Sequence, residues 1–259
     1  MEAKHAPDAT QRFTSRVDDY VKARPGYPAG VVDVLRARVG LDSTWAIADV
    51  GSGTGISARL FLQAGNRVFA VEPNDAMRAA AEKSLAHFQN FTSVVGTAER
   101  TTLPDGAVHL VVAAQAFHWF DRAAFRAECR RILKPGGQVL LLWNDRLLAG
   151  SPFLEAYERL LQQFATDYKA VNHQNITPED LAAFFGRPPS RADLPNEQRL
   201  DFEGLRARLL SSSYVPRQGH ERFAAMLAEL RRIYDVNAEA DAVRVLYRTQ
   251  MFFGPLAQG

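Results

Sequence analysis

The stretch Asp49-Val-Gly-Ser-Gly-Thr-Gly55 decides the fold, because its three glycines follow an apolar segment directly. Residues 45–50, Trp-Ala-Ile-Ala-Asp-Val, have the composition of a buried strand, and residues 56–64 place their apolar side chains on one face of a helix. Glycines adopt backbone conformations closed to other residues and let a ligand lie against the main chain. The stretch therefore predicts a ligand-binding turn between a strand and a helix.

Strands and helices alternate outward from this turn. We expect further strands at 67–72, 91–95, 108–114 and 138–143, and helices at 31–39, 76–87 and 121–133. Near-continuous apolar strands separated by amphipathic helices are typical of a parallel sheet that is covered on both faces. The pattern indicates a doubly wound, Rossmann-like α/β fold with right-handed crossovers.

The alternation ends after Trp143. Residues 147–190 look helical and lack strands, with aromatic side chains that would suit a pocket wall or ordinary helix packing. Beyond them we expect a short strand near 199–202, helices at 203–212 and 219–234, and a final strand at 243–253 on an edge of the sheet. The sheet would then have seven, mostly parallel, strands. The aromatic residues in question are Phe153, Tyr157, Phe164, Tyr168, Phe184 and Phe185.

Composition limits the class of protein. The chain has 259 residues, of which 47% are hydrophobic and 23% charged, as in an ordinary globular protein. The formal charge is +2 with the arginines scattered, whereas nucleic-acid binders gather theirs into one patch. The single cysteine, Cys129, excludes an internal disulfide and a multi-cysteine zinc site, and its position within an expected helix predicts a core side chain. With no apolar signal segment at the start and no run of about 18 apolar residues, we expect a cytoplasmic, soluble protein.

Two features of the glycine turn narrow the ligand. A dinucleotide-binding turn would require Gly or Ala at position 56, and a phosphate-binding loop would require Lys followed by Ser or Thr; the sequence has Ile56-Ser57. Glu72 ends the second expected strand, where an acid can accept hydrogen bonds from both hydroxyls of an adenosyl ribose. A surface Glu is the alternative, but the apolar run 68–71 carries this residue to the strand end.

Further motifs follow in a fixed order. They are Gly96-Thr-Ala-Glu99 after the third strand, Ala113-Ala-Gln-Ala-Phe-His-Trp-Phe120 after the fourth, and Arg131-Ile-Leu-Lys-Pro-Gly-Gly137 before the fifth. With these motifs the chain resembles the class I S-adenosylmethionine-dependent methyltransferases, and among them the small-molecule enzymes related to ubiquinone-biosynthesis and trans-aconitate methyltransferases. The resemblance covers residues 13–146 well and the remainder weakly.

The resemblance implies S-adenosylmethionine as the cofactor, S-adenosylhomocysteine as the product, and a set of contact residues. Arg24 would pair with the cofactor carboxylate, and a solvated surface Arg is the alternative. The implied cofactor-binding residues are Asp49, Gly51, Ser52, Gly53, Gly55, Glu72, Pro73, Asn74, Met77, Ala98, Glu99, Ala114 and Gln115, with Tyr20 and Arg24 from an amino-terminal cap.

The expected organisation is a single methyltransferase domain over residues 1–259. Within it, residues 1–40 form the amino-terminal cap, 41–146 the cofactor-binding core, 147–195 a helical lid and 196–259 the carboxyl-terminal part of the sheet. Open α/β sheets bind ligands at the carboxyl ends of their strands, where this lid would lie. A packing subdomain without ligand contact is the alternative.

The expected reaction is in-line methyl transfer to a small-molecule acceptor with an O, N or C nucleophile. Holding the two reacting atoms in line in a dry site can supply much of the rate. His118 is the candidate general base, and a histidine stacked on Trp119 or capping a helix is the alternative. Trp119, Asn144, Arg146 and Tyr214 are candidate substrate contacts. An Arg146 near Arg24 would suit an acidic acceptor such as a carboxylic acid.

Other functions are kept as alternatives. They are an RNA methyltransferase, a cofactor-binding protein without catalysis and a nicotinamide-dependent oxidoreductase, and Ile56 counts against the last. We expect a monomer or homodimer that acts on a small molecule, with no nucleic acid, membrane or metal as a partner.

Overall fold

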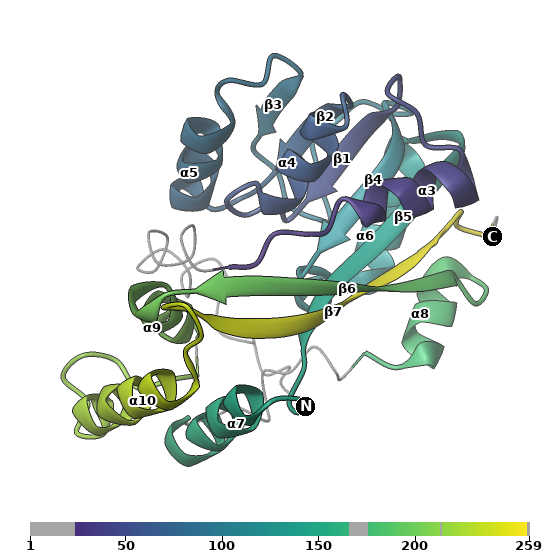
Figure 1. Ribbon diagram of the computed structural model, residues 1–259. Coiled ribbons are helices and arrows are strands. Elements are labelled where there is room, and N and C mark those ends of the chain that lie inside the picture. Colours follow the sequence, from purple (N-terminus) through teal and green to yellow (C-terminus); the bar gives the residue numbers. More distant parts are fainter. Residues whose placement is uncertain (1–23, 166–175, 213, 258–259) are drawn as a thin grey trace, which may run out of the picture.

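The computed structural model describes residues 24–165, 176–212 and 214–257, and it contains one mixed sheet. The sheet has seven strands in the order β3-β2-β1-β4-β5-β7-β6 (Figure 1). This is the expected doubly wound α/β class. The strands are β1 (Ala46–Val50), β2 (Arg67–Val71), β3 (Phe91–Val94), β4 (Val108–Ala114), β5 (Leu133–Arg146), β6 (Ser190–Leu200) and β7 (Val243–Gly254).

Strands β1 to β5 are parallel, whereas β7 runs antiparallel between β5 and β6. The prediction that residues 243–253 form an edge strand is therefore wrong, because β6 occupies the edge. The strand expected near 199–202 is also longer and earlier, over Ser190–Leu200. Because β6 is an edge strand, many of its side chains are exposed and polar, and it tolerates Pro195, whose missing N–H would interrupt a central strand. This polar composition lacks the apolar pattern from which strands are predicted.

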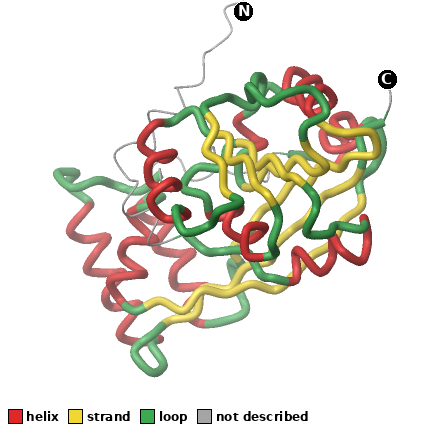
Figure 2. Tube along the Cα trace, turned by 90° about the horizontal axis from the view of Figure 1, so that it is seen from above, coloured by secondary structure: helices red, strands yellow, loops and turns green. Residues whose placement is uncertain are grey.

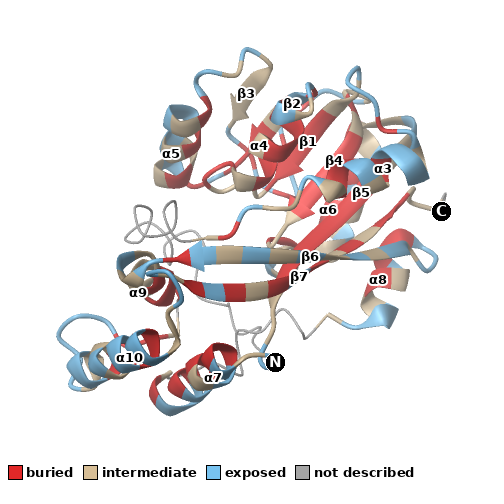
Figure 3. Cartoon of the chain, viewed as in Figure 1, coloured by how far each residue is buried: buried red, intermediate tan, exposed pale blue. Residues whose placement is uncertain are grey.

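The helices cover both faces of the sheet and one end of it (Figure 2). On one face, α3, α4 and Leu85 of α5 pack with the core; on the other, α6 and α8 do so. Figure 3 shows the central strands buried and the outer sides of α5 and α10 exposed. The helices are α3 (Gly30–Val39), α4 (Ile56–Gln63), α5 (Asp75–Leu85), α6 (Arg122–Ile132), α7 (Pro152–Phe164), α8 (Pro178–Phe185), α9 (Phe202–Leu210), α10 (Phe223–Asn237) and the short 3₁₀ helix η1 (Phe117–Trp119).

A separate apolar core lies beyond the carboxyl end of β5, where α7, α9 and α10 gather around the first half of β7 (Figure 1). We call these helices the three-helix cluster. The segment 147–195, expected as one lid, is divided: α7 belongs to this cluster, whereas α8 packs against α6 on the sheet face. The aromatic side chains divide in the same way, with Phe153, Tyr157 and Phe164 in the cluster and Phe184 and Phe185 beside α6; Tyr168 lies outside the described residues.

Candidate functional site

A cavity opens at the carboxyl ends of β1, β4 and β5. Its wall combines the glycine turn, the end of β4, and residues from the amino-terminal segment, α9 and β7. This is the end of the sheet where open α/β folds bind ligands. The lining residues are Arg24, Pro25, Tyr27, Gly51, Ser52, Gly53, Thr54, Ile56, Ser57, Ala114, Gln115, Asn144, Arg208 and Tyr247.

The three glycines of the turn serve different purposes. All have positive φ, at 67° for Gly51, 54° for Gly53 and 82° for Gly55. A Cβ at Gly51 would lie 2.8 Å from the Cβ of Ala116, and one at Gly55 would lie 2.6 Å from Cδ1 of Leu85. At Gly53 the nearest atom would be Sδ of Met77 at 3.6 Å. Gly51 and Gly55 therefore allow close packing, and Gly53 leaves the backbone open on the side of the cavity.

Asp49 lies behind the turn. Its side chain is fully buried, and its Oδ2 accepts a 2.7 Å hydrogen bond from Oγ of Ser57 in the first turn of α4. Burial raises the pKa of Asp49 to about 7, although the bonds from Ser57 and the Ala58 amide oppose that rise. Asp49 is not among the residues that line the cavity. It holds the start of α4 against the end of β1.

Glu72 connects the glycine turn to the turn after β2. Its Oε2 accepts from the Gly53 amide and its Oε1 from the Asn74 amide, each at 2.9 Å. Burial raises the pKa of Glu72, and these two amide bonds act in the opposite direction. Asn74 then caps α5 by accepting from the Met77 amide at 3.0 Å. Each carboxylate oxygen of Glu72 keeps a second lone pair for a ligand hydroxyl.

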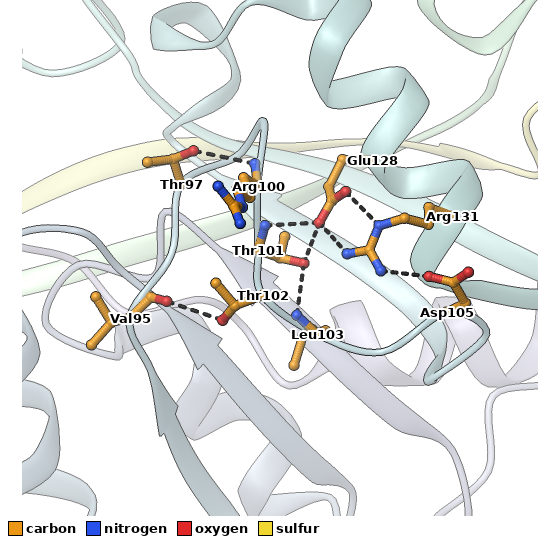
Figure 4. A network of polar contacts seen from close by, with 9 residues as sticks. All are labelled: Val95, Thr97, Arg100, Thr101, Thr102, Leu103, Asp105, Glu128 and Arg131. Carbon is orange, nitrogen blue, oxygen red and sulfur yellow. Dashed lines mark hydrogen bonds and ion pairs between the residues drawn. The ribbon is translucent and has the colours of Figure 1, made fainter.

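The loop after β3 is anchored by a buried carboxylate that the motifs did not reveal (Figure 4). Oε1 of Glu128, on α6, accepts from the Thr101 amide at 2.8 Å and from its hydroxyl at 2.5 Å. Arg131 donates to both oxygens of Glu128 and also pairs with Asp105 at 2.6 Å. The only signal for this contact in the sequence is an acid on the inward side of an amphipathic helix.

The two predicted residues of the loop after β3 have different surroundings. Ala98 is buried, and the Glu99 carboxylate accepts a hydrogen bond from the Asp121 amide at 3.1 Å.

Gln115 ends β4 in a strained conformation. Its φ of 57° lies in the left-handed region, which is uncommon for a non-glycine residue and concentrates at functional sites. Its side-chain amide donates to the Asn144 carbonyl at 3.2 Å, and the residue lines the cavity. The strain places a polar side chain between the ends of two central strands.

The candidate base and its neighbour follow on η1. The ring centroids of His118 and Trp119 lie 4.9 Å apart with the ring planes tilted by 44°, so the two rings are in contact but are not stacked. Trp119 is 36% exposed. Neither residue lines the cavity around Gln115.

The other candidate substrate contacts are distributed unevenly. Asn144 lines the cavity, with its amide donating to the Gly26 carbonyl at 3.0 Å and its oxygen accepting from the Thr249 hydroxyl at 2.6 Å. Arg146 points elsewhere and forms a buried ion pair with Glu158 of α7. Arg24 lines the cavity and donates to the Ser211 carbonyl at 3.2 Å. Tyr20 lies outside the described residues.

Arg208 and Tyr247 line the cavity but were not anticipated. Both come from the part of the chain where the motifs are weakest. The Arg208 side chain is 7% exposed and its Nε donates to the Tyr247 hydroxyl at 3.1 Å; Tyr214 lies close to the same guanidinium. A charged residue in the last turn of a helix, such as Arg208 in α9, gives no sign of which way it faces until the tertiary packing is known.

Comparison with known proteins agrees with this geometry. Residues 48–141 match the family model of the methyltransferase domain. An uncharacterised methyltransferase-like protein of Schizosaccharomyces pombe is 29% identical over 93% of both chains. An uncharacterised methyltransferase of Mycobacterium bovis is 36% identical, and that match spans about half, 54%, of each chain.

Solved structures share the fold. A protein of Anaeromyxobacter dehalogenans, classed provisionally as a type II methyltransferase, superimposes with a TM-score of 0.63 at 21% identity, over 91% of this chain and 99% of its own. The phosphoethanolamine N-methyltransferase 2 of Haemonchus contortus, solved with phosphomonomethylethanolamine and S-adenosylhomocysteine, gives 0.53 at 17% identity over 97% of this chain and 59% of its own.

Among the described residues, no helix is long and apolar enough to span a membrane. The glycine turn, the acid at the end of β2 and the strand order occur together in one sheet, and the matched domain covers all of them except the last two strands. Residues 48–141 thus match a methyltransferase domain, the chain is similar to a methyltransferase-like protein over 93% of its length, and its fold is that of class I methyltransferases.

Proposed function

We propose that this protein transfers the methyl group of S-adenosylmethionine to a small-molecule acceptor, by in-line displacement within the cavity described above. The observation that carries the proposal is the composition of that cavity, in which the glycine turn and the end of β4 face polar residues from β5, α9 and β7. One side has the features of a cofactor cradle, and the other offers groups to orient a second molecule.

The cofactor would lie along the glycine turn. Gly53 leaves room for close approach, Glu72 would accept from the ribose hydroxyls, and Met77 below the turn would support the adenosine. Arg24, at the cavity wall, would pair with the carboxylate of the methionine moiety. When bound, S-adenosylmethionine supplies an electrophilic methyl group on a sulfonium.

The protein itself would mainly position the reactants and exclude water. Gln115 and Asn144 hold fixed orientations through their hydrogen bonds and present polar groups to the acceptor. His118 remains the candidate base for an acceptor that must lose a proton, and an acceptor that is already a carboxylate would need none. A reducing cytosol suits the buried thiol of Cys129.

The test is calorimetric titration with S-adenosylmethionine, S-adenosylhomocysteine and NADH, on the wild type and on Glu72→Ala. We expect micromolar binding of both adenosyl ligands, at least tenfold weaker binding in the variant, and no binding of NADH. Glu82→Ala is the matched control, since Glu82 lies on the exposed side of α5. Failure of both adenosyl ligands to bind the wild type would contradict the proposal. Binding without methyl transfer to any member of a broad acceptor panel would favour the non-catalytic alternative.

A further inference from the structure

Arg208 is a buried residue of the cavity wall that has no role in the methyl transfer proposed above. It lies on α9, inside the three-helix cluster, and its side chain reaches the wall of the cavity together with Gln115 and Asn144. Only 7% of its surface is exposed. A guanidinium is rarely buried unless an anion or several hydrogen-bond acceptors surround it.

Within the described residues, the surroundings of Arg208 supply acceptors but no anion. Its Nε donates to the Tyr247 hydroxyl, and Tyr157 and Tyr214 are its other close polar neighbours. Its Nη1 is buried without a hydrogen-bond partner, and no ion pair joins Arg208 to any carboxylate in the described residues. Burial raises the pKa of Tyr157 to about 12, so this phenol stays uncharged at neutral pH and cannot neutralise the guanidinium.

Arg146 is a second buried arginine, and it differs from Arg208 in its partner. Arg146 is buried to a similar extent at the end of β5 and has a carboxylate partner in Glu158. The fold therefore compensates one buried arginine internally and leaves the other beside a cavity. Because a buried cation without a counter-ion is unfavourable, the described residues leave a place for an anionic ligand beside Arg208.

Two anions could fill that place, the cofactor carboxylate and the acceptor. Arg24 and the residues after it form the wall near Gly53 and Thr54, as expected for the methionine end of the cofactor. Arg208 lines the same cavity from α9 and is held by the Tyr247 hydroxyl of β7, whereas Arg24 donates to the Ser211 carbonyl at the end of that helix. The cavity wall thus contains two arginines, enough for one anionic group on each of two ligands.

We propose that Arg208 is a specificity-determining residue that anchors an oxyanion of the acceptor, a carboxylate or a phosphate, with the help of the Tyr247 hydroxyl. The proposal rests on the methyltransferase function proposed above. The planar guanidinium suits both oxyanions because each offers two oxygens to its parallel N–H groups. The acceptor would therefore be a small acid, bound after or with the cofactor.

The experiment titrates the complex of the protein with S-adenosylhomocysteine against succinate, inorganic phosphate and neutral succinamide. Wild type is compared with Arg208→Met and with Arg206→Met, an exposed arginine on the same helix. We expect millimolar binding of succinate or phosphate to the wild type and no binding of succinamide. Arg208→Met should weaken oxyanion binding at least tenfold and change S-adenosylhomocysteine affinity less than twofold, and Arg206→Met should match the wild type. The preferred probe identifies the oxyanion as carboxylate or phosphate.

Three results would overturn the inference. They are no oxyanion binding to the wild-type complex, unchanged oxyanion binding in Arg208→Met, or a tenfold loss of S-adenosylhomocysteine affinity in that variant, which would assign Arg208 to the cofactor carboxylate. If Arg208→Met does not fold, Arg208→Lys is the deciding variant. Lysine keeps the positive charge but lacks the two parallel N–H groups of the guanidinium, so this variant should bind oxyanions several-fold more weakly with unchanged cofactor affinity. Failure of the wild type to bind S-adenosylhomocysteine would instead refute the proposed function itself.

Discussion

Asp49 shows how one residue of a binding motif can act from behind it. The carboxyl group is fully buried beneath the glycine turn, bonded through one oxygen to Ser57, while its Oδ1 has no partner among the described residues. The neutral acid is favoured in such a place because burial penalises the charge. Its role in the motif is therefore to fix the start of α4, whereas the residues of the turn itself line the cavity.

The buried acid predicts a pH dependence of stability. The folded pKa of Asp49 is about 7 and its ordinary value is 3.8, so the folded state binds more protons between these values. The free energy of unfolding due to Asp49 must then fall as pH rises from about 4 to 7, by at most about 1.4 kcal/mol per pH unit. Relative to Asp49→Asn, the wild type should lose stability over this window, as measured by urea unfolding at half-unit steps of pH. Asp33→Asn, at an exposed site, should show no such trend; a flat Asp49 difference would mean that the carboxylate is stabilised when ionised.

At this scale the sequence singled out the glycine turn and Glu72 as candidate site residues, but it did not show which way the arginines face. The turn is local, so its glycines and the strand before it are visible as a continuous pattern. Whether Arg146 or Arg208 faces the cavity depends on contacts with Glu158 and Tyr247, which are remote in sequence. Those contacts depend on how α7 and β7 pack, and no local pattern encodes them.

At the scale of elements, helix α6 holds the loop after β3. Glu128 of this helix accepts hydrogen bonds from the amide and the hydroxyl of Thr101 in the loop. Burial alone would raise the pKa of Glu128, but the bonds from Arg131 and Thr101 outweigh it and lower the pKa to about 2. The loop after β3 is thus held in place by a helix that packs in the same core on the same face of the sheet.

Replacing Glu128 by Gln should therefore destabilise the protein in a pH-dependent way. A depressed folded pKa gives stability that is present above the ordinary value of 4.5 and is lost as pH falls toward about 2. We expect Glu128→Gln to cost about 1–3 kcal/mol at pH 7 in urea unfolding, and the difference from the wild type to shrink below pH 5. The control is Glu229→Gln on α10, where a half-buried carboxylate pairs with the exposed Arg232 at the same spacing and should contribute at most about 0.5 kcal/mol. Equal losses in the two variants would show that the connection to Thr101 adds nothing.

The parallel half of the sheet could be predicted element by element, and the antiparallel half only in part. Strands β1, β2, β4 and β5 are buried on both faces, so each appears as an apolar run between turn residues. In β6 the pattern of exposure alternates and the strand contains Pro195, so its sequence resembles a loop. Residues 243–253 were predicted as a strand from their alternation, but alternation does not reveal which neighbours a strand has.

At the scale of the whole molecule, buried polar contacts join the three-helix cluster to the sheet. The Arg146–Glu158 pair connects the end of β5 to α7, and the Arg146 guanidinium also lies 5.2 Å from the centre of the Tyr157 ring. The cluster has its own apolar core, separate from the two sheet cores. A unit of this kind can loosen without global unfolding, because the other cores remain packed.

Glu158→Gln tests whether this ion pair holds the cluster in place beside the cavity. Both side chains are about one-tenth exposed, so removing the carboxylate leaves a buried guanidinium without its charged partner and should cost about 2–4 kcal/mol locally. Hydrogen exchange followed by mass spectrometry should show faster exchange in α7 and at the end of β5, with β1 and β2 unchanged. Glu155→Gln, on the exposed side of α7, should exchange like the wild type. If exchange in β1 and β2 became faster by the same factor as in α7, the cluster and the sheet would unfold as one unit. The cavity wall formed by Arg208 could then not move independently of the glycine turn.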